Sequence, residues 1–198
     1  MTKGPLFILS GPSGSGKSTV IARLLADKKL PVRLAVSATT RAPRQGECDG
    51  EHYHFWSRER FDKERTADGF LEWAEVFGNC YGSLKSEVEP YRQRGLGVLL
   101  EIDVKGWEQV RRRCPDAMSI FLRTSSLETY EKRLRDRGTE SEESIKRRLE
   151  GARAELARAP EYDYQVINDD LDSAVAQLRS IVLTAFKPQE SSTAGGQG

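Results

Sequence analysis

Short apolar runs alternate along most of this chain with longer segments in which apolar residues recur every three or four positions. Uninterrupted runs of this length are typical of strands buried on both faces, whereas the periodic segments are typical of amphipathic helices. The runs predict strands at 6–9, 32–36, 97–102, 118–122 and 164–167. The periodic segments predict helices at 19–26, 104–113, 127–137, 142–159 and 171–186. Strands that alternate with helices predict an α/β fold in which helices flank a parallel five-stranded sheet.

The segment 39–95 departs from this alternation, because it is richer in aromatic and turn-forming residues. The stretches 52–56 and 70–77 have the pattern of strands with one exposed face, and a helical pattern at 58–66 lies between them. We therefore expect a lobe inserted into the parallel fold. The expected division is a core of 1–36, 96–126 and 160–186, an inserted lobe of 37–95, a lid with flanking helices at 127–159, and a disordered polar tail at 187–198.

The composition excludes a general attraction to polyanions. The 198 residues include 31 basic and 30 acidic side chains, which leave a net charge of +1. A chain without a strong net charge is not drawn as a whole to nucleic acid or to a membrane surface, so we expect neither as a partner. An anionic ligand must then be bound by a local cluster of basic residues. The length fits one domain, or one domain with inserted lobes.

The cysteines and the N-terminal segment predict a cytoplasmic protein. The chain has three cysteines, Cys48, Cys80 and Cys114, which lie far apart and form no C-x-x-C pair. An odd, scattered set of this kind is typical of a reducing compartment. The apolar run at 6–9 is too short for the core of a signal peptide or for a membrane span.

Residues 11–18 read GPSGSGKS and match the phosphate-binding pattern G-x-x-x-x-G-K-[ST] between a predicted strand and a predicted helix. Glycines let the backbone turn so that several N–H groups point at one phosphate, and the start of the helix adds a favourable dipole. We expect Lys17 to reach the β- and γ-phosphates of a nucleotide and Ser18 to bind Mg²⁺. The expected nucleotide-binding residues of this loop are Gly11, Ser13, Gly14, Ser15, Gly16, Lys17, Ser18 and Thr19.

The loop pattern by itself does not distinguish kinases from GTPases and ATPases. Residues 103–106 (DVKG) spell the D-x-x-G of GTPase switch loops. However, the chain has only two asparagines, Asn79 and Asn168, and neither lies in an N-K-x-D motif for reading guanine. Asp103 equally fits a carboxylate at the end of a strand that helps to hold Mg²⁺.

Two stretches concentrate arginines in the way that a phosphotransferase requires. Such an enzyme must neutralise the charge of two anionic substrates, and the planar fork of arginine pairs with two phosphate oxygens at once. One stretch is 39–44, directly after the second predicted strand, and the other is 133–137, followed by Arg147 and Arg148. The second stretch fits a solvated helix face equally well, which is the usual place of charged runs.

From about Pro5 to Phe186 the chain resembles guanylate kinase, a P-loop family that transfers a phosphoryl group from ATP to GMP. The resemblance rests on eight blocks in the same order, which are far more specific together than the phosphate loop alone. They are SGPSGSGKST at 10–19, SATTRAPR at 37–44, GECDGEHY at 46–53, FLEW at 70–73, YGS at 81–83, LEID at 100–103, RGTESEES at 137–144 and NDDL at 168–171. The resemblance implies a P-loop core with a GMP-binding lobe and a short lid, and it implies ATP as co-substrate and Mg²⁺ as cofactor.

The resemblance also implies where GMP binds. Arg41 and Arg44 would bind its phosphate together with the hydroxyls of Tyr53 and Tyr81. Glu72 would read guanine, because a carboxylate accepts from the N1–H and N2–H₂ donors that adenine does not present side by side. Taken without the resemblance, Glu72 fits a surface carboxylate on a strand. The implied GMP-binding residues are Ser37, Arg41, Arg44, Tyr53, Glu72, Tyr81, Ser83, Glu101 and Asp103.

On the donor side, the resemblance implies lid arginines that close over the ATP phosphates. The implied catalytic residues are Lys17, Arg41, Arg137 and Arg148, the further ATP contacts are Arg133, Asn168 and Asp169, and the implied Mg²⁺ ligands are Ser18 and Asp103. Asn168 and Asp169 equally fit a turn and helix N-cap before Leu171, and Asp103 or Glu101 fits a cap of the helix at Val104. No general base is expected, since the phosphate of GMP is already an anionic nucleophile.

Two other interpretations keep this fold. A guanylate-kinase-like interaction module would bind proteins instead of nucleotides, but Lys17, Arg41 and Arg44 argue against it. A related kinase would use another nucleoside monophosphate or a sugar phosphate as acceptor, but Ser37 and Glu72 argue against that.

A cysteine and two histidines of the inserted segment are not explained by any of these interpretations. Cys80 stands where the family often has an aromatic residue or histidine. His52 and His54 alternate on a predicted strand near Cys48, which allows a metal site, although no fourth ligand has fitting spacing.

Overall fold

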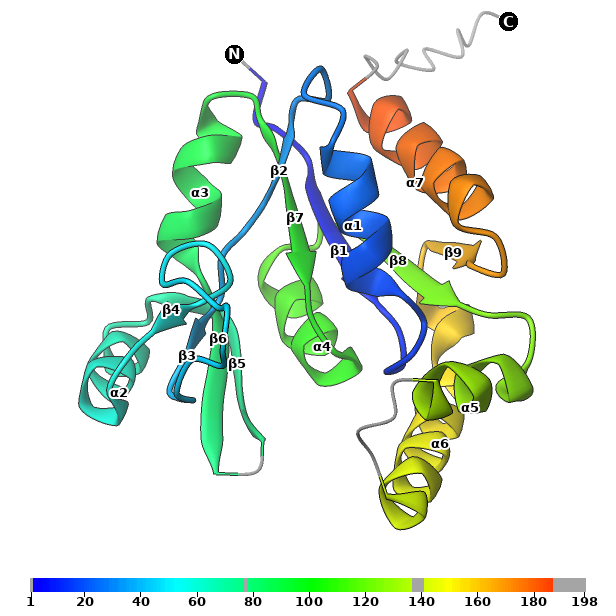
Figure 1. The fold of residues 1–198 in the computed structure, drawn as a ribbon. Coiled ribbons are helices and arrows are strands. Elements are labelled where there is room, and N and C mark those ends of the chain that lie inside the picture. Colours follow the sequence, from blue (N-terminus) through cyan, green and yellow to red (C-terminus); the bar gives the residue numbers. More distant parts are fainter. Residues whose placement is uncertain (1, 77, 137–140, 187–198) are drawn as a thin grey trace, which may run out of the picture.

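The computed structural model describes residues 2–76, 78–136 and 141–186. Its largest element is a sheet of five parallel strands in the order β2-β7-β1-β8-β9 (Figure 1). The strands are β1 (Leu6–Ser10), β2 (Val32–Leu34), β7 (Gly97–Glu101), β8 (Met118–Arg123) and β9 (Tyr164–Ile167). The predicted parallel five-stranded sheet is therefore confirmed. The predicted strand at 32–36 ends earlier, at Leu34.

Alternation along β1 explains why helices cover both faces of this sheet. Leu6 and Ile8 pack into one core and Phe7 and Leu9 into another, and all four are buried. Side chains of successive strand residues point to opposite faces, so an unbroken apolar run supplies both cores. The first core is shared with α3 (Lys85–Gln93) and α4 (Val104–Arg113), and the second with α1 (Lys17–Leu25) and α7 (Leu171–Ala185).

A second, four-stranded sheet lies in the segment predicted to be an inserted lobe, and its strand order is β4-β3-β6-β5. It has a small core of its own, in which the rings of Phe61 and Phe70 stack with centroids 4.5 Å apart. The predicted strand at 52–56 is shorter in the structure, while the predicted helix at 58–66 is confirmed. The elements are β3 (Ala38–Thr39), β4 (His54–Phe55), α2 (Arg58–Thr66), β5 (Phe70–Val76) and β6 (Asn79–Leu84).

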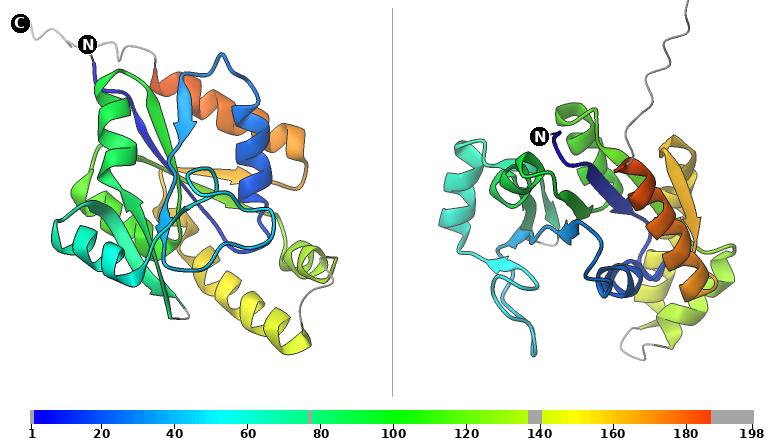
Figure 2. Two further views of the ribbon diagram at one scale, coloured as in Figure 1. Left: turned by 60° about the vertical axis from the view of Figure 1, so that its left-hand side comes forward. Right: turned by 90° about the horizontal axis from the view of Figure 1, so that it is seen from above.

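The sequence patterns did not predict β6 or α3. Gly82 interrupts the pattern of β6, and Pro90 lies inside α3, where it is normally unfavourable. The structure shows that α3 runs back from the small sheet to β7 (Figure 2). Its buried Arg92 donates to the Gly4 carbonyl oxygen at 2.8 Å and pairs with Asp116, which ties α3 to the main sheet.

The helices α5 (Leu127–Arg135) and α6 (Glu142–Ala157) pack against each other, and a short 3-10 turn, η1 (Ala159–Glu161), follows them. Ser126 and Ser141 cap their N-termini by accepting from backbone N–H groups. This pair lies on one side of the end of the main sheet, and the small sheet lies on the other (Figure 1). Arg137 and the tail at 187–198 lie outside the described residues, and the division into core, lobe and lid stays a prediction.

Among the described residues, no helix combines the length and the apolar character that a membrane span requires.

Candidate active site

Two adjoining cavities open where β1 and β7 end. The larger has a volume of about 490 Å³ and lies over the phosphate loop, and the smaller, of about 260 Å³, reaches into the small sheet. Ligands of open parallel sheets bind at the carboxyl ends of the strands, and both cavities lie there. The residues that line both are Ser37, Tyr53, Glu101, Ile102 and Asp103.

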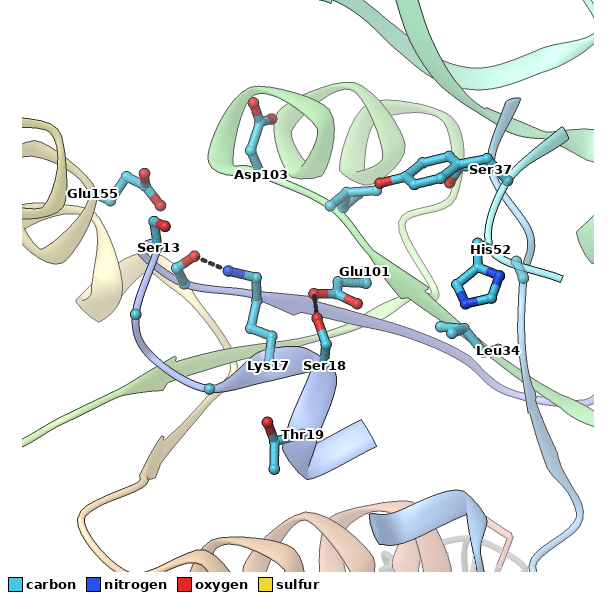
Figure 3. A pocket seen from close by; sticks show the side chains of 16 residues that line it. Ser13, Lys17, Ser18, Thr19, Leu34, Ser37, His52, Glu101, Asp103 and Glu155 are labelled. Carbon is cyan, nitrogen blue, oxygen red and sulfur yellow. Dashed lines mark hydrogen bonds between the residues drawn. The ribbon is translucent and has the colours of Figure 1, made fainter. Parts of the chain in front are cut away.

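The phosphate loop is shaped by glycines in left-handed conformations. Gly14 and Gly16 both have φ of 90°, and Gly16 is the residue before α1. The Nζ of Lys17 donates to the carbonyl oxygen of Gly11 at 2.5 Å (Figure 3). It also donates to that of Pro12 at 3.3 Å. The lysine therefore already has acceptors within its own loop, and a nucleotide phosphate would have to replace them.

Asn168 and Arg133 brace this loop from outside the larger cavity. The buried amide of Asn168 donates to the Ser15 carbonyl oxygen at 2.7 Å. Arg133 donates to the carbonyl oxygen of Asn168 at 2.7 Å and, at 3.5 Å, to those of Gly14 and Ser15. Neither residue lines either cavity. Their contact with ATP stays a prediction, and the contacts seen here position the loop.

Arg148 is the lid arginine that the structure places at the phosphate loop, where it donates to the Ser13 hydroxyl at 2.9 Å. Asp169 accepts from the backbone N–H of Ser125 at 2.9 Å. The N-cap of α7 is Asp170, which accepts from the Ser173 N–H. The alternative that Asn168 or Asp169 caps this helix is therefore wrong, because the cap lies one residue after Asp169.

Three carboxylates face Lys17 and Ser18 in the larger cavity (Figure 3). Glu101 accepts from the Ser18 hydroxyl at 3.0 Å. Asp103 caps α4 by accepting from the Gly106 N–H at 2.8 Å, as the capping alternative predicted. Glu155 comes from α6 and was missed by sequence reasoning. Its only sequence signal was a position about two helical turns after Arg148, on the same side of a predicted helix.

Burial and the charge of Lys17 act on the pKa of Glu155 in opposite directions. Burial raises the pKa of its carboxyl group, and the nearby Lys17 ammonium lowers it, with burial the larger effect. The Asp103 carboxylate adds to the rise. The larger cavity thus sets three carboxyl groups, one of them with a raised pKa, opposite Lys17, which suits a phosphate ligand that is bound together with a cation.

In the smaller cavity, Glu72 is almost fully buried, with 6% of its surface exposed. The hydroxyl of Ser83, opposite it on β6, donates to its Oε1 at 2.7 Å. Burial raises the pKa of Glu72 to about 7, while the Ser83 hydrogen bond opposes the rise and Asp103 adds to it. A buried carboxylate with one hydrogen bond has acceptor capacity left for a ligand that carries N–H groups.

An ion pair occupies the arginine turn that the sequence singled out. The guanidinium of Arg41 donates through both terminal nitrogens to Glu47 at 2.9 Å, and the backbone N–H of Arg44 donates to the same carboxylate at 2.7 Å. These bonds lower the pKa of Glu47 to about 2 and raise that of Arg41. Sequence reasoning missed Glu47, whose one signal was a negative charge three positions after Arg44.

The tyrosines of the smaller cavity lie near this ion pair. The rings of Tyr53 and Tyr81 meet edge to face with centroids 6.1 Å apart, and the Arg41 guanidinium lies 5.6 Å from the Tyr53 ring. Both tyrosines line the smaller cavity together with Ser37. The structure thus brings Ser37, Arg41, Tyr53, Glu72 and Tyr81 to one region of the small sheet.

The histidines of the predicted metal site face different partners. His54 lies 3.2 Å from Glu87, measured from Nε2 to Oε1, whereas the Nδ1 of His52 accepts from the Cys48 N–H at 3.1 Å. Cys48, Glu51 and His52 are exposed, and their ligand atoms lie within 4.8 Å of one another. This group does not include His54, so the pairing of His52 with His54 is not seen. Cys80 is buried in the core of the small sheet.

Comparisons with known proteins agree on one family. The family model described as guanylate kinase matches residues 3–185. The chain is 52% identical to a guanylate kinase of Synechococcus sp. (strain CC9311) over 171 residues, which are 86% of this chain and 90% of the relative. It is 48% identical to that of Chromobacterium violaceum, over 90% of this chain and 85% of the relative. The crystal structure of guanylate kinase from Anaplasma phagocytophilum superposes with a TM-score of 0.77 at 30% identity and covers 95% of this chain and 89% of its own.

Proposed function

This chain belongs to the guanylate kinase family and is an ATP:GMP phosphotransferase, and we propose how its two adjoining cavities divide the reaction between them. The larger cavity binds ATP, and the smaller binds GMP. The observation that carries this assignment is the buried Glu72, which is held by Ser83 in a cavity that shares five residues with the one over the phosphate loop.

On the donor side, the backbone N–H groups of the phosphate loop surround the ATP phosphates. Lys17 leaves the carbonyl oxygens of Gly11 and Pro12 for the β- and γ-phosphates, which are stronger acceptors because they are charged. Arg148, already at Ser13, approaches the transferred phosphoryl group from α6. Arg137 would join it from a position outside the described residues. Arg133 and Asn168 hold the loop in shape.

The oxygen donors near the loop fit Mg²⁺. Ser18 and Asp103, with Glu101 beside them, offer one hydroxyl and two carboxylates, and hard cations prefer such ligands. Mg²⁺ neutralises charge on the β- and γ-phosphates when it is bound. Ser18 and Asp103 would hold it, and Glu101 would accept from the Ser18 hydroxyl and orient it.

On the acceptor side, the Arg41 fork and Arg44 bind the GMP phosphate with the hydroxyls of Tyr53 and Tyr81. Glu72 accepts from N1–H and N2–H₂ of guanine, and Ser37 and Ser83 complete the base pocket. Adenine would leave the buried Glu72 carboxylate with Ser83 but without the two donors of guanine, which is why such a site discriminates by several orders of magnitude.

Catalysis on this assignment rests on positioning and on electrostatic stabilisation. The GMP phosphate attacks as an anion, so the chain needs to align two phosphates and shield them from water. The small sheet and the α5–α6 pair lie on either side of the end of the main sheet where the two cavities open, and we expect them to approach each other when both substrates bind. Small-angle scattering that shows no compaction with both ligands would contradict this closure.

The decisive experiment is a coupled assay of ADP release with ATP and Mg²⁺ that compares GMP, AMP, CMP, UMP and no acceptor. We expect turnover with GMP alone and its loss in Lys17→Ala. Glu72→Ala should lower kcat/KM for GMP by about 100-fold or more, because it removes the charged acceptor for guanine. Turnover without preference among the acceptors would contradict the role of Glu72. Absence of turnover in folded protein would favour the interaction module.

The remaining proposals concern the compartment and the binding partners of the enzyme. We place it in the cytoplasm, since its three scattered cysteines are typical of a reducing compartment and are free in the structure. Its partners are the small molecules ATP and GMP, and the net charge of +1 favours neither nucleic acid nor a membrane surface.

A further inference from the structure

Gly106, in the first turn of α4, lies directly behind the carboxylate of Glu72. A Cβ atom at this position would stand 2.9 Å from Oε2 of Glu72 and 3.2 Å from its carboxyl carbon. Such distances are shorter than van der Waals contact, so the carboxylate reaches its present place only because residue 106 has no side chain. Gly106 has ordinary helical geometry, so backbone conformation gives no reason for a glycine here.

The helix that carries Gly106 cannot move away to make room. Trp107 and Val110 are fully buried, and the Trp107 ring stacks on Tyr162 with centroids 4.1 Å apart. One turn further on, the Gln109 amide donates to the carbonyl oxygen of Trp73 at 3.0 Å and accepts from its N–H at 3.2 Å. Trp73 follows Glu72 on β5. The helix is thus fixed both to the main core and to the strand that carries Glu72.

Glu72 is held between two surfaces. Ser83 binds Oε1 on one side, and Gly106 faces Oε2 on the other. The backbone N–H of Gly106 also donates to Asp103, which lines the same smaller cavity. The first turn of α4 therefore sets the positions of two carboxylates of the acceptor site at once.

We propose that Gly106 is a specificity-determining residue, which positions Glu72 by leaving room for its carboxylate against α4. The inference rests on the proposed role of Glu72 in reading guanine. An added methyl group displaces the flexible end of the Glu72 side chain by a few tenths of an ångström or more, because α4 is fixed. The two hydrogen bonds to guanine depend on that position, whereas the fold does not.

The test compares Gly106→Ala with Gly151→Ala. Gly151 lies inside α6, and a Cβ there would meet no atom within 4 Å. Alanine favours helix at both positions, so we expect Gly151→Ala to be at least as thermally stable as the wild type. In Gly106→Ala the contacts of the new Cβ with Glu72 and, at 3.3 Å, with Ile102 oppose this gain, so its melting temperature should be lower than that of Gly151→Ala. We expect kcat/KM for GMP to fall by about 10-fold or more in Gly106→Ala, since misplacements of up to 1 Å can cost about 100-fold. KM for ATP should stay unchanged, and so should all constants of Gly151→Ala.

A double variant shows whether the effect passes through Glu72. In a Glu72→Ala background the space behind the carboxylate is open, so Gly106→Ala should cause no further loss of GMP turnover. If Gly106→Ala fails to fold, the double variant should fold again, because the shortest contact, with the Glu72 carboxylate, is gone and only that with Ile102 at 3.3 Å remains. An additive loss in the double variant, or a folding defect that Glu72→Ala does not relieve, overturns the proposal.

The same measurements separate this inference from the proposed function. If Glu72→Ala lowers GMP turnover and Gly106→Ala does not, Gly106 has no role in specificity and the function of Glu72 stands. If Glu72→Ala leaves GMP turnover unchanged, the role of Glu72 in reading guanine is wrong, and the inference about Gly106 is overturned with it.

Discussion

The phosphate loop and the small sheet present polar groups to the same cleft in two different ways. The loop uses backbone groups, whose directions are set by the left-handed Gly14 and Gly16 and by a buried amide from Asn168. The small sheet uses side chains, with Glu72 held by one hydroxyl and Arg41 by one carboxylate. The geometry of the phosphate loop depends on positions that carry no side chain, such as Gly14 and Gly16. Binding at the small sheet depends on charged side chains, such as Glu72 and Arg41. Substitutions should therefore affect the two regions by different mechanisms.

Gly16→Ala should have the largest effect on the backbone side. Gly16 has φ of 90°, and a residue with a side chain in this conformation destabilises the folded state by about 1–2 kcal/mol. In addition, the Cβ atom of an alanine would lie 2.4 Å from Nδ2 of Asn168. We expect kcat/KM for ATP to fall by about 100-fold, because the loop must open to relieve the clash. Steady-state kinetics with a thermal melt measure both consequences.

Gly95→Ala is the matched control for this variant. Gly95 has φ of 81°, but a Cβ there would find its nearest atom at 3.8 Å. Strain without a clash should cost stability and leave the kinetics intact. Equal activities of the two variants would show that the contact with Asn168 does not shape the loop.

Arg41→Ala tests the side-chain region with the next largest effect. Loss of a bidentate charged pair is worth about 2 kcal/mol, which corresponds to a rise of about 30-fold in KM for GMP. KM for ATP should not change, because Arg41 lies in the small-sheet region. Arg60→Ala is the control, since Arg60 belongs to the same lobe and lies over the ring of Trp56. A similar rise in both KM values would mean that Arg41 supports the fold and not the acceptor.

The pH dependence of KM for GMP should distinguish the small sheet from the phosphate loop in the wild-type protein. Glu72 must be ionised to accept from guanine, and its pKa in the ligand-free protein is raised to about 7. Its ionised fraction rises about tenfold from pH 6 to pH 8, so KM for GMP should fall about tenfold over this range. Glu72→Gln should show no such dependence. A pH-independent ratio of the KM values for GMP and ATP would contradict the raised pKa.

The same pKa predicts how the stability of the ligand-free protein changes with pH. The folded protein keeps the Glu72 proton up to about pH 7, whereas the unfolded chain releases it near 4.5. The contribution of Glu72 to the free energy of unfolding is therefore greatest below pH 4.5 and is lost as pH rises towards 7, by about 3 kcal/mol at most. Denaturant titrations of wild type and Glu72→Gln across this range measure the difference.

Asn168→Ala should have the smallest effect of these changes. It leaves the Ser15 carbonyl oxygen without the amide that donates to it, which costs about 1–3 kcal/mol of unfolding free energy. KM for ATP should rise only a few-fold, because Arg133 still reaches the loop. Gln177→Ala, an exposed amide on α7, is the control. Unchanged stability would show that Arg133 alone braces the loop.

Local sequence patterns were sufficient to predict the elements that have a recognisable motif or a regular apolar spacing within their own residues. The phosphate loop was predicted because backbone geometry requires its glycines and phosphate chemistry requires Lys17 and Ser18. The bounds of α4 and β9 are as predicted because their apolar spacing is regular. The α3 helix was missed because its stability comes from tertiary contacts of Val88 and Arg92, which outweigh the unfavourable Pro90.

Contacts between distant segments explain what the sequence did not predict in the site. The role of Gly106 depends on Glu72 lying behind it, and the place of Glu155 depends on the packing of α6 beside the cleft. The contact of Arg133 with ATP stays a prediction, and the structure adds hydrogen bonds of Arg133 to the backbone carbonyl oxygens of Gly14 and Ser15 that the sequence did not predict. An arginine that binds a phosphate and an arginine that supports the phosphate loop cannot be told apart in the sequence.

If Arg41 binds the GMP phosphate as proposed, its ion pair with Glu47 makes acceptor binding a displacement reaction, in which the phosphate replaces the Glu47 carboxylate. The Glu47 carboxylate accepts from three donors, two on Arg41 and the backbone N–H of Arg44, and these are the groups assigned to the GMP phosphate. A phosphate dianion competes for them with twice the charge, whereas the uncharged nucleoside guanosine brings no anion and leaves the pair closed. The turn should thus select ligands that carry a phosphate, because the phosphate takes the place of the Glu47 carboxylate on the same three donors. Calorimetry should show a small enthalpy for this step, since similar bonds are broken and formed.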